Sequence, residues 1–483
     1  MSAAGAPGLE AAPAVATARE ALAGRRAWVV GGALRDALSG RPVVDVDLAV
    51  PAGEERESAQ AIARAVGGSA FPLSTEFGTW RAVAPRQAWH VDVTRLRAPS
   101  IEADLAQRDF TINAMALPLH EPEAGPIDPY GGLRDLADGL LRAVSERSFS
   151  DDPLRLLRAA RLASAYGLRI EPDTLAQARA CAGRAAEPAG ERQLAELRAL
   201  LAGADPARGI ELLGELGALR EVLPEVEGLR GVEQNPNHHL DVLGHTLEVV
   251  RRTVEVEQQL DRFAGEAAEE VGRLLAEPLG DEFTRSTALR LGALLHDVGK
   301  PATKGERSGY VTFIGHDAVG AEMSRGILRR LKASRALSRH VEGLVRHHLH
   351  LGFLVHERPL SRRRVYEYLD RCGDVAADVT LLTAADRLSA RGSGAVASPQ
   401  MIEAHLELVR EMLPAALAWH REGPPALPVR GDELAEALGI ERGPRLGELL
   451  DRLRAEAYVR GLRTREEAIA AARRLLAEGP AGD

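Results

Sequence analysis

The stretch Val29–Asp36 reads VVGGALRD, and VDVDL follows at Val44–Leu48. Apolar β-branched residues before the paired glycines predict a strand that leads directly into a helix. Glycines at such a junction let backbone amides approach a phosphate, because no Cβ blocks the way. Asp45 and Asp47 alternate with apolar residues, so both carboxylates point to one face of the next strand. Each fragment alone is also typical of a turn or a helix cap, and only the ordered pair indicates a phosphate and metal site.

A third carboxylate, Asp92, lies in HVDVT at His90–Thr94, which alternates like a further strand. Carboxylate oxygens are the ligands that hard divalent cations prefer. Two Mg²⁺ ions held in this way can bridge a triphosphate and an attacking hydroxyl. The pattern therefore predicts a magnesium site at Asp45 and Asp47, and Asp92 is expected to complete the catalytic set.

Further motifs continue this pattern, and together they resemble the class II tRNA nucleotidyltransferases and bacterial poly(A) polymerases. GGALRD at Gly31–Asp36 with the two aspartates is similar to motif A, and QRDFTINAMA at Gln107–Ala116 is similar to motif B, with Gln107 where Arg is usual. DPYGG at Asp128–Gly132 and DDPLRLLRAARL at Asp151–Leu162 match the end of the head and the neck. The resemblance covers roughly residues 27 to 230. It implies nucleotide-binding roles for Gly31, Gly32, Arg35, Asp36, Arg108, Asp109, Asn113, Asp152, Arg155, Arg158 and Arg161.

The neck motif offers a way to recognise a base without a template. Asp152, Arg155, Arg158 and Arg161 recur every three residues. On a helix, residues three apart are neighbours, so we expect Asp152 and Arg155 to share a face. One carboxylate acceptor and one guanidinium donor can together read a base edge, which is the role that the resemblance implies. A solvent-exposed ion pair on a helix would have the same spacing.

The middle of the chain carries a series of histidines and aspartates that resembles the HD phosphohydrolase superfamily. The adjacent His296-Asp297 pair, followed by Gly299 and Lys300, is its most specific part. Imidazole and carboxylate groups spread over several helices suit a divalent metal. In binuclear members of that superfamily, further ligands occur at the places in the series that His316 and one of His347 or His348 occupy here. The expected ligands are His245, His296, Asp297, His316, His347, His348 and Asp386.

These ligand types do not separate Mn, Ni, Fe and Mg, so the identity of this second metal stays open. A metal-bound water would attack a phosphate ester, and the resemblance implies phosphatase or cyclic phosphodiesterase activity. Core histidines or helix caps are the alternative explanation of the series. We prefer that alternative for His238, His239 and His350.

Composition narrows the class of protein. At 483 residues the chain is too long for one core, and a net charge of −9 argues against general nucleic-acid coating. No apolar run is long enough to cross a membrane, and 2 cysteines suit a reducing cytoplasm. Strand signals fade after Ser150, so we predict an α+β chain with a small α/β head and an elongated all-α body. The expected domains are a flexible tail (1–26), a nucleotidyltransferase head (27–145), a helical neck (146–230), an HD domain (231–395) and a helical tRNA-binding tail (396–483).

The sequence thus predicts a cytoplasmic enzyme that adds nucleotides from CTP and ATP to the 3′ end of tRNA. A poly(A) polymerase shares every head motif and is the nearest alternative. A second alternative is a nucleotide-hydrolysing HD enzyme whose head only senses a ligand. The Asp45 and Asp47 pair argues against this second alternative.

One departure from the family concerns which nucleotides are added. The resembled enzymes carry a flexible loop of roughly twenty residues between the strand with the third acid and motif B. Here Arg97 is followed by only Ala98-Pro99-Ser100 before Ile101, and a tight connection cannot sweep over an active site as a lid does. The resemblance links that loop to the switch from CTP to ATP. We therefore expect a CC-adding enzyme that needs a separate A-adding partner, rather than a complete CCA-adding enzyme.

Overall fold

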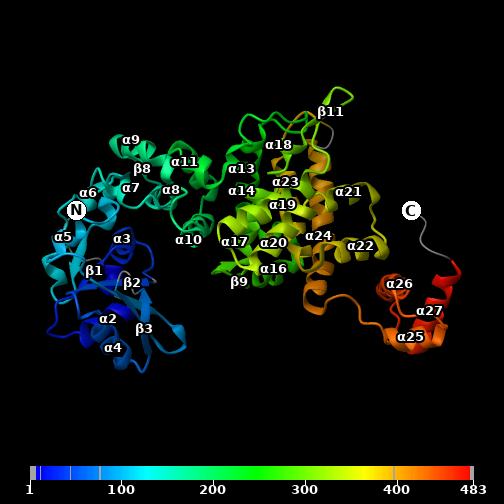
Figure 1. Ribbon diagram of the computed structural model, residues 1–483, viewed down its shortest axis with the longest axis horizontal. Coiled ribbons are helices and arrows are strands. Elements are labelled where there is room, and N and C mark those ends of the chain that lie inside the picture. The colour runs from blue at the N-terminus through cyan, green and yellow to red at the C-terminus, as the bar shows by residue number, and fades with distance from the viewer. Residues whose placement is uncertain (1–6, 11, 44, 75–77, 395–396, 479–483) are drawn as a thin grey trace. The chain divides into compact units, whose positions relative to one another are not determined.

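The computed structural model describes residues 7–10, 12–43, 45–74, 78–394 and 397–478 (Figure 1). The chain divides into two compact units, residues 1–188 with 211–222 and residues 189–210 with 223–483. The first unit holds a six-stranded mixed sheet, and the second is almost entirely helical. The predicted α+β class is confirmed. Within the described ranges, no helix is long and apolar enough to cross a membrane.

The sheet of the first unit places the predicted strands at its centre. Its strand order is β3-β4-β5-β2-β1-β6, in which β2 and β5 are parallel and the other pairs are antiparallel. Strand-like alternation in the sequence at residues 27–30, 44–50, 80–84 and 89–94 predicts four strands, and all four are present, although Val44 lies outside the described residues. Two strands were missed, because β3 is an edge strand containing Pro72 and β6 has only three residues. The strands are β1 (Trp28–Val30), β2 (Asp45–Val50), β3 (Ser69–Ser74), β4 (Thr79–Val83), β5 (His90–Arg95) and β6 (Ala116–Pro118).

Alternation along β2 and β5 gives the sheet one apolar and one polar face. Val46, Leu48, Val91 and Val93 are at most 1% exposed and point into the main core of this unit. That core is completed by helices α2 (Pro13–Ala21), α3 (Gly32–Leu38) and α4 (Glu55–Ala65). The intervening residues of the same two strands point to the opposite face, which is where the carboxylates lie.

The prediction of a flexible tail at 1–26 is wrong for the described part of that segment. Residues 7–10 form α1 (Pro7–Glu10), and α2 follows directly. Leu9, Val15, Ala18 and Leu22 are at most 1% exposed and belong to the core under the sheet. The Ala-rich composition hid this role, because small apolar residues at helical spacing can pack closely without forming a long hydrophobic run.

The segment after the sheet forms the predicted helical neck, with one correction. Asp152 does not lie on a helix with Arg155, because α8 begins at Arg155 and Asp152 is extended (φ −146°, ψ 99°). Pro153 accounts for this, since a proline disfavours the helical conformation of the residue before it.

The remaining elements of the first unit are α5 (Ile101–Leu105), α6 (Gly132–Ala137), β7 (Leu140–Leu141), α7 (Ser148–Asp151), α8 (Arg155–Tyr166), β8 (Arg169–Ile170), α9 (Pro172–Cys181), α11 (Pro206–Glu215) and α12 (Leu219–Val222).

The second unit is a helical bundle followed by three C-terminal helices with a core of their own. In the bundle, α14 packs against α17 and α23, and α23 packs against α24 (Figure 1). A buried ion pair between Arg285 and Asp378 joins α17 to α23. Two short hairpins, β9–β10 and β11–β12, interrupt the helices.

The bounds in the second unit are α10 (Gly190–Leu201), α13 (Pro224–Glu227), α14 (Val242–Gln258), α15 (Leu260–Ala264), α16 (Ala268–Leu275), β9 (Pro278–Gly280), β10 (Phe283–Thr284), α17 (Arg285–Leu295), α18 (Lys300–Thr303), β11 (Gly305–Arg307), β12 (Tyr310–Thr312), α19 (His316–Arg330), α20 (Arg335–His347), α21 (His350–Leu354), α22 (Arg362–Cys372), α23 (Ala376–Ser389), α24 (Pro399–Glu422), α25 (Gly431–Leu438), α26 (Pro444–Arg460) and α27 (Arg465–Ala477).

The packing of α2 gives a first prediction. Leu22→Ala should lower the free energy of unfolding of the first unit by about 2–5 kcal/mol, because a fully buried side chain leaves a cavity. Three of the four tryptophans (Trp28, Trp80 and Trp89) lie in this unit, so denaturation followed by tryptophan fluorescence reports it. The exposed Glu20→Ala is the matched control and should change little. Equal, small effects of the two changes would show that α2 is not part of the core.

Candidate catalytic and metal sites

Three carboxylates converge on the polar face of the sheet in the first unit. The parallel register of β2 and β5 places Asp47 opposite Asp92, while Asp45 lies two residues earlier on the same face, opposite His90. Burial, together with the charge of Asp92, raises the pKa of Asp47 to about 6. Carboxylates held this close repel one another when ionised, so the arrangement favours a bound cation. These are the residues that the sequence predicted as a catalytic metal site.

Two further nitrogen-bearing side chains, which the sequence did not indicate, approach the same carboxylates. The Nε and Nη2 atoms of Arg81 donate to the two carboxylate oxygens of Asp92, at 2.7 and 2.8 Å. The Nε2 atom of His90 lies 3.1 Å from Oδ1 of Asp45. His90 could have been found from its position two residues before Asp92 in the same strand. Arg81 could not, because its contact depends on β4 pairing with β5.

Gly31 brings the backbone close to this site. Its φ of +67° is costly for residues with a side chain, and it directly precedes α3. A Cβ here would lie 3.2 Å from Nη1 of Arg108 and 3.4 Å from Oδ2 of Asp47. Glycine therefore keeps open the space between the Arg108 guanidinium and the Asp47 carboxylate. Gly32, the first residue of α3, has ordinary helical backbone.

Several residues predicted to bind nucleotide form a buried network that joins the two head motifs to the neck. Nη1 of Arg35 donates to Oδ1 of Asn113 at 2.5 Å, and its Nη2 donates to Asp36 at 2.9 Å. The hydroxyl of Tyr166, at the end of α8, also donates to Asp36. The Arg35 guanidinium lies 4.5 Å from the centre of the Tyr166 ring. Tyr166 was not singled out from the sequence, although it lies within the neck helix.

Asp109 is the second centre of this network. Its carboxylate accepts from Nη1 of Arg158 at 3.1 Å, from Nδ2 of Asn113 at 3.0 Å and from the backbone amide of Phe110 at 2.8 Å. Burial acts to raise the pKa of Asp109, but the charge of Arg158 and these hydrogen bonds outweigh it and hold the pKa at about 2. Asp109 therefore carries a firmly ionised charge that ties motif B to the neck helix.

The Arg155 side chain also contacts motif B, at backbone carbonyl oxygens of that motif. Its guanidinium donates to the carbonyl oxygens of Gln107 at 2.8 Å, Arg108 at 3.3 Å and Ser148 at 3.2 Å. Asp152 is close enough to favour the charge of Arg155, although burial lowers the pKa of this guanidinium overall. Arg158 and Arg161 follow on the same half-buried face of α8. The structure thus places Asp152 and Arg155 near each other without a shared helix.

The second unit brings six of the seven predicted HD residues into one buried cluster. Five of them are at most 8% exposed, and Asp386 on α23 is half-buried. Nε2 of His245 lies 3.1 Å from Oδ1 of Asp386, and Nε2 of His296 lies 3.1 Å from Oδ2 of Asp297. Nε2 of His316 lies 3.4 Å from Oδ1 of Asp297 and 3.3 Å from Nε2 of His348.

Backbone carbonyls fix how these histidines present their rings. The Nδ1 atoms of His296, His316 and His348 lie 2.8, 2.7 and 2.6 Å from the carbonyl oxygens of Ala293, Phe313 and Val345. A carbonyl only accepts, so each Nδ1 donates to it and each ring turns its Nε2 atom to the cluster. Nε2 atoms that face carboxylates and one another are placed to share a bound cation. Metal-binding histidines are commonly oriented in this way.

The cluster divides into two ligand sets that share Asp297 as their link. His245, His296 and Asp386 form one set, and Asp297, His316 and His348 form the other, each with its ligand atoms within 4.8 Å. Oδ2 of Asp297 faces the first set, and Oδ1 faces the second. Lys300 donates from Nζ to Oδ2 of Asp297 at 2.6 Å and to Oε1 of Gln234 at 2.7 Å.

His347 was expected to join this cluster, and the structure does not place it there. His347 is the last residue of α20, and its Nδ1 lies 3.2 Å from Nδ1 of His350. The neighbouring His348 points to His316 instead. The helical rotation of about 100° between adjacent residues sends the two rings to different sides of the turn.

Three family models match the chain in the order that the motifs suggested. The poly A polymerase head domain matches residues 27–142, the probable RNA and SrmB-binding site of polymerase A matches residues 167–229, and the HD domain matches residues 242–391. The fold, the carboxylate face and these matches define a nucleotidyltransferase with an HD domain.

Similar proteins with assigned names narrow the class of nucleotidyltransferase to which the chain belongs. The A-adding tRNA nucleotidyltransferase of Deinococcus radiodurans is 37% identical, over 94% of this chain and 96% of the relative. The CC-adding tRNA nucleotidyltransferase of Thermus thermophilus is 33% identical, over 92% of each chain. A multifunctional CCA protein of Methylococcus capsulatus is 34% identical, over 72% of this chain and 77% of the relative. The chain belongs to the tRNA nucleotidyltransferase family and is an enzyme of this kind.

Solved structures agree with this fold. The apo form I of a CCA-adding enzyme aligns with a TM-score of 0.60 at 20% identity, over 97% of this chain and 94% of that chain. The Thermotoga maritima CCA-adding enzyme, solved in complex with tRNA, aligns with a TM-score of 0.58 at 20% identity, over 97% and 98%. At this identity the alignments establish the fold.

The environment of Asp109 gives a second prediction. Because its pKa is lowered to about 2, the charge of Asp109 stabilises the folded state above the unfolded pKa near 3.8, and this contribution is lost as pH falls toward 2. Asp109→Asn should therefore cost about 2 kcal/mol, by the same amount at pH 7 and at pH 5. Urea denaturation followed by tryptophan fluorescence measures the difference.

A double-mutant cycle with Arg158→Met provides the control for this prediction. Most of the loss in Asp109→Asn should disappear when Arg158 is already changed, because the two side chains form one ion pair. A loss that shrinks between pH 7 and pH 5 would contradict the lowered pKa. A loss that is unaffected by Arg158→Met would contradict the pairing.

Proposed function

We propose that this enzyme adds cytidine residues from CTP to the 3′ end of tRNA and stops after two. The observation that carries the chemistry is the convergence of Asp45, Asp47 and Asp92 on one sheet face, opposite Gly31 and Arg108. The 3′ hydroxyl oxygen of the tRNA would form a bond to the α-phosphorus of CTP. The bond from that phosphorus to the β-phosphate oxygen breaks, and pyrophosphate leaves.

The residues of the first unit suit these steps. Two Mg²⁺ ions at Asp45 and Asp47 would neutralise the triphosphate and activate the hydroxyl. Asp92 lies beside Asp47, and Arg81 balances its charge. A metal ion or the RNA end would displace that contact with Arg81. Arg108 brings a positive charge next to Asp47 and would face the phosphates across Gly31. Positioning and charge neutralisation would supply most of the rate.

Base selection would rest on the neck. Asp152 and Arg155 offer a carboxylate acceptor and guanidinium donors close together, as the edge of a cytosine requires. Arg155 is held by three backbone carbonyls of the head and the neck, so its direction is fixed before a base arrives. A pre-oriented donor reads a base edge with less loss of side-chain entropy.

The choice of CC addition rests on the connection between β5 and α5. Residues 96–100 are held at three points within this stretch. The amide of Leu96 donates to the carbonyl of Val50 at 2.8 Å, the amide of Arg97 donates to Asp104 at 2.9 Å, and Ser100 caps α5 through the amide of Ala103 at 3.3 Å. So short and so anchored a connection cannot close over a nucleotide, which supports loss of the switch to ATP.

Addition of A alone is the second candidate. It is favoured by the Deinococcus radiodurans relative, whose name gives A addition and whose identity of 37% exceeds the 33% of the CC-adding relative. The short connection argues for CC addition against it. A separate A-adding partner would follow only from CC addition, and the comparisons give it no support.

For the second unit, we infer a metal-dependent phosphohydrolase site around Asp297. A binuclear divalent centre would activate a water for attack on a phosphate ester. His245, His296 and Asp386 would hold one ion, His316 and His348 the other, and Asp297 would bridge them. Lys300 and Gln234 border the cluster and could orient the phosphate. The ligand set is compatible with Mn, Ni, Fe or Mg.

The two sites should be separable. Asp47→Asn should lower CTP incorporation roughly 1000-fold or more, because a carboxylate that holds the catalytic metal is lost. Phosphatase activity on p-nitrophenyl phosphate should remain. The double change His296→Asn with Asp297→Asn should do the reverse.

Asp138→Asn, an exposed acid of the first unit, is the matched control and should change neither activity. Circular dichroism would show that each variant is folded. Loss of both activities in a folded single-site variant would contradict two independent centres.

The nucleotide specificity can be read from three tRNA substrates ending at the discriminator base, at C and at CC. Labelled CTP should be added twice to the first and once to the second, and labelled ATP should not be added to the third. Efficient ATP addition to the CC end, with no CTP addition to the other two, would establish A addition instead.

An insertion tests the role of the connection itself. A family-length loop placed between Arg97 and Ile101 should confer ATP addition on the CC end. A Gly/Ser insertion of equal length is the matched control and should not. ATP addition by the unmodified enzyme would remove the basis for CC specificity.

A further inference from the structure

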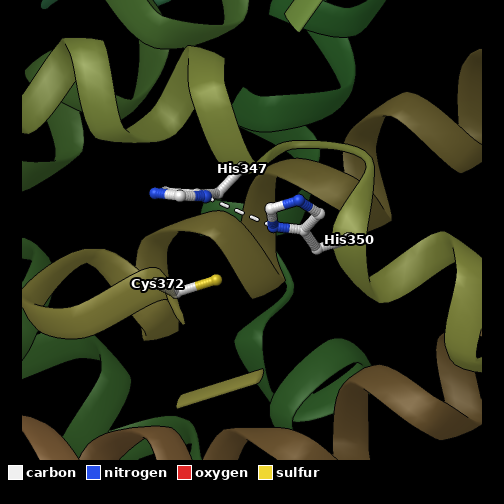
Figure 2. A group of neighbouring side chains, drawn as sticks. All are labelled: His347, His350 and Cys372. Atoms are coloured by element: carbon white, nitrogen blue, oxygen red, sulfur yellow. Dashed lines mark hydrogen bonds between the residues drawn. The ribbon is translucent and has the colours of Figure 1, made fainter. Parts of the chain in front are cut away.

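A second group of metal-binding side chains lies outside the sites described above. His347 ends α20, His350 begins α21 and Cys372 ends α22, so three helix ends meet at one point. Figure 2 shows the two imidazole rings facing each other, with the Cys372 sulfur pointing toward them. The Nδ1 atoms of the two histidines are 3.2 Å apart, and one ligand atom from each of the three residues lies within 4.8 Å of the others.

The donor chemistry points to a particular class of ion. Two imidazole nitrogens and one thiolate favour Zn²⁺ and its analogue Co²⁺ over Mg²⁺ or Ca²⁺. With metal–nitrogen bonds near 2.0–2.1 Å in a tetrahedron, two nitrogen ligands lie about 3.3 Å apart. The Nδ1 pair already has this separation. The sulfur needs to approach by at most about 1 Å to reach its own ligand distance of about 2.3 Å.

A hydrogen bond between two neutral imidazoles explains the histidine pair alone. It does not involve the Cys372 sulfur, which has a side-chain hydrogen bond with Tyr368 and also lies within ligand distance of the pair. Burial raises the pKa of the Cys372 thiol to about 12, so the thiol is protonated when no metal is bound, although the nearby Arg371 favours the thiolate. A metal would take the sulfur as thiolate and release that proton to solvent.

We propose that His347, His350 and Cys372 form a zinc-class metal site, distinct from the cluster around Asp297, with water as the fourth ligand. The three ligands belong to three successive helices, so the ion would tie α20, α21 and α22 together. Asp317 favours positive charge at the two histidines, whereas Arg371 near both and Arg346 near His347 oppose it. The thiolate would offset one of the two charges of the ion.

The site would also position a residue of the neighbouring cluster. His348 directly follows His347 and turns its ring to His316, at 3.3 Å. An ion that holds His347 and His350 fixes the turn between α20 and α21 from both ends. His348 would then be held in place for the cluster around Asp297 without contact between the two metal sites.

Cobalt gives a specific test, because the chain contains only two cysteines, Cys181 and Cys372. Full-length, metal-free protein is titrated with Co²⁺ under reducing conditions, and the thiolate-to-cobalt charge-transfer absorption in the near ultraviolet is followed. No sulfur lies among the residues of the cluster around Asp297, so cobalt bound there does not give this band. The band should reach its maximum when sulfur binds one cobalt ion per protein chain, and Zn²⁺ should abolish the band by displacing that ion.

Four variants separate the outcomes. Cys372→Ser should abolish the band, whereas the matched control Cys181→Ser should keep it. His350→Asn should weaken cobalt binding at this site by at least roughly tenfold, and His316→Asn, in the other cluster, should leave the band unchanged. Circular dichroism and the thermal midpoint establish that each variant is folded.

Absence of the band in the unmodified protein at excess Co²⁺ would overturn the proposal. A band that survives Cys372→Ser would overturn it as well. Equally tight binding of cobalt at this site in folded His350→Asn would also overturn it.

Discussion

The structure depends on one electrostatic constraint, which is that carboxylates close together in a partly buried place repel one another unless positive charge lies near them. In the first unit, burial and Asp92 raise the pKa of Asp47 to about 6. In the second unit, Nε2 of His245 faces Asp386, and Nε2 of His296, whose Nδ1 donates to a backbone carbonyl, faces Asp297. Both arrangements suit a divalent ion, because carboxylates and imidazoles are common ligands of such ions. One chain therefore carries two clusters of potential metal ligands, with different side chains and in different compact units.

Most of the motif residues in the first unit support the site through contacts inside the protein, and they do not form its exposed surface. Arg35 and Asp36 connect α3 to Asn113 and Tyr166, and Asp109 connects motif B to Arg158. These contacts join segments that are far apart in the chain, and they hold the carboxylate face and the neck helix in a fixed relation. Under the proposed function, side chains that read a base need few alternative positions. The buried network supplies that rigidity, and this explains why guanidinium groups are used for carbonyl and carboxylate contacts inside the protein.

Local patterns predicted much of this arrangement. Alternation placed Asp45 and Asp47 on one face, because that signal depends on short-range geometry. The resemblance of the histidine and aspartate series to the HD superfamily predicted six residues of the HD cluster. What could not be predicted depends on long-range pairing or on a single turn. Arg81 reaches Asp92 only because β4 pairs with β5, and His347 leaves the cluster because one helical step rotates it away. Pro153 removed Asp152 from its expected helix, and that local rule was available from the sequence.

If the carboxylate face of the first unit and the cluster around Asp297 hold metal ions independently, both should bind manganese. Anomalous diffraction from crystals soaked with Mn²⁺ and a non-hydrolysable CTP analogue would test this expectation. Manganese density should lie between the carboxylates of Asp45 and Asp47, in contact with the triphosphate, and separate density should lie on both sides of Asp297. Nucleotide density on the sheet face without a metal at Asp47, or manganese at neither side of Asp297, would contradict it.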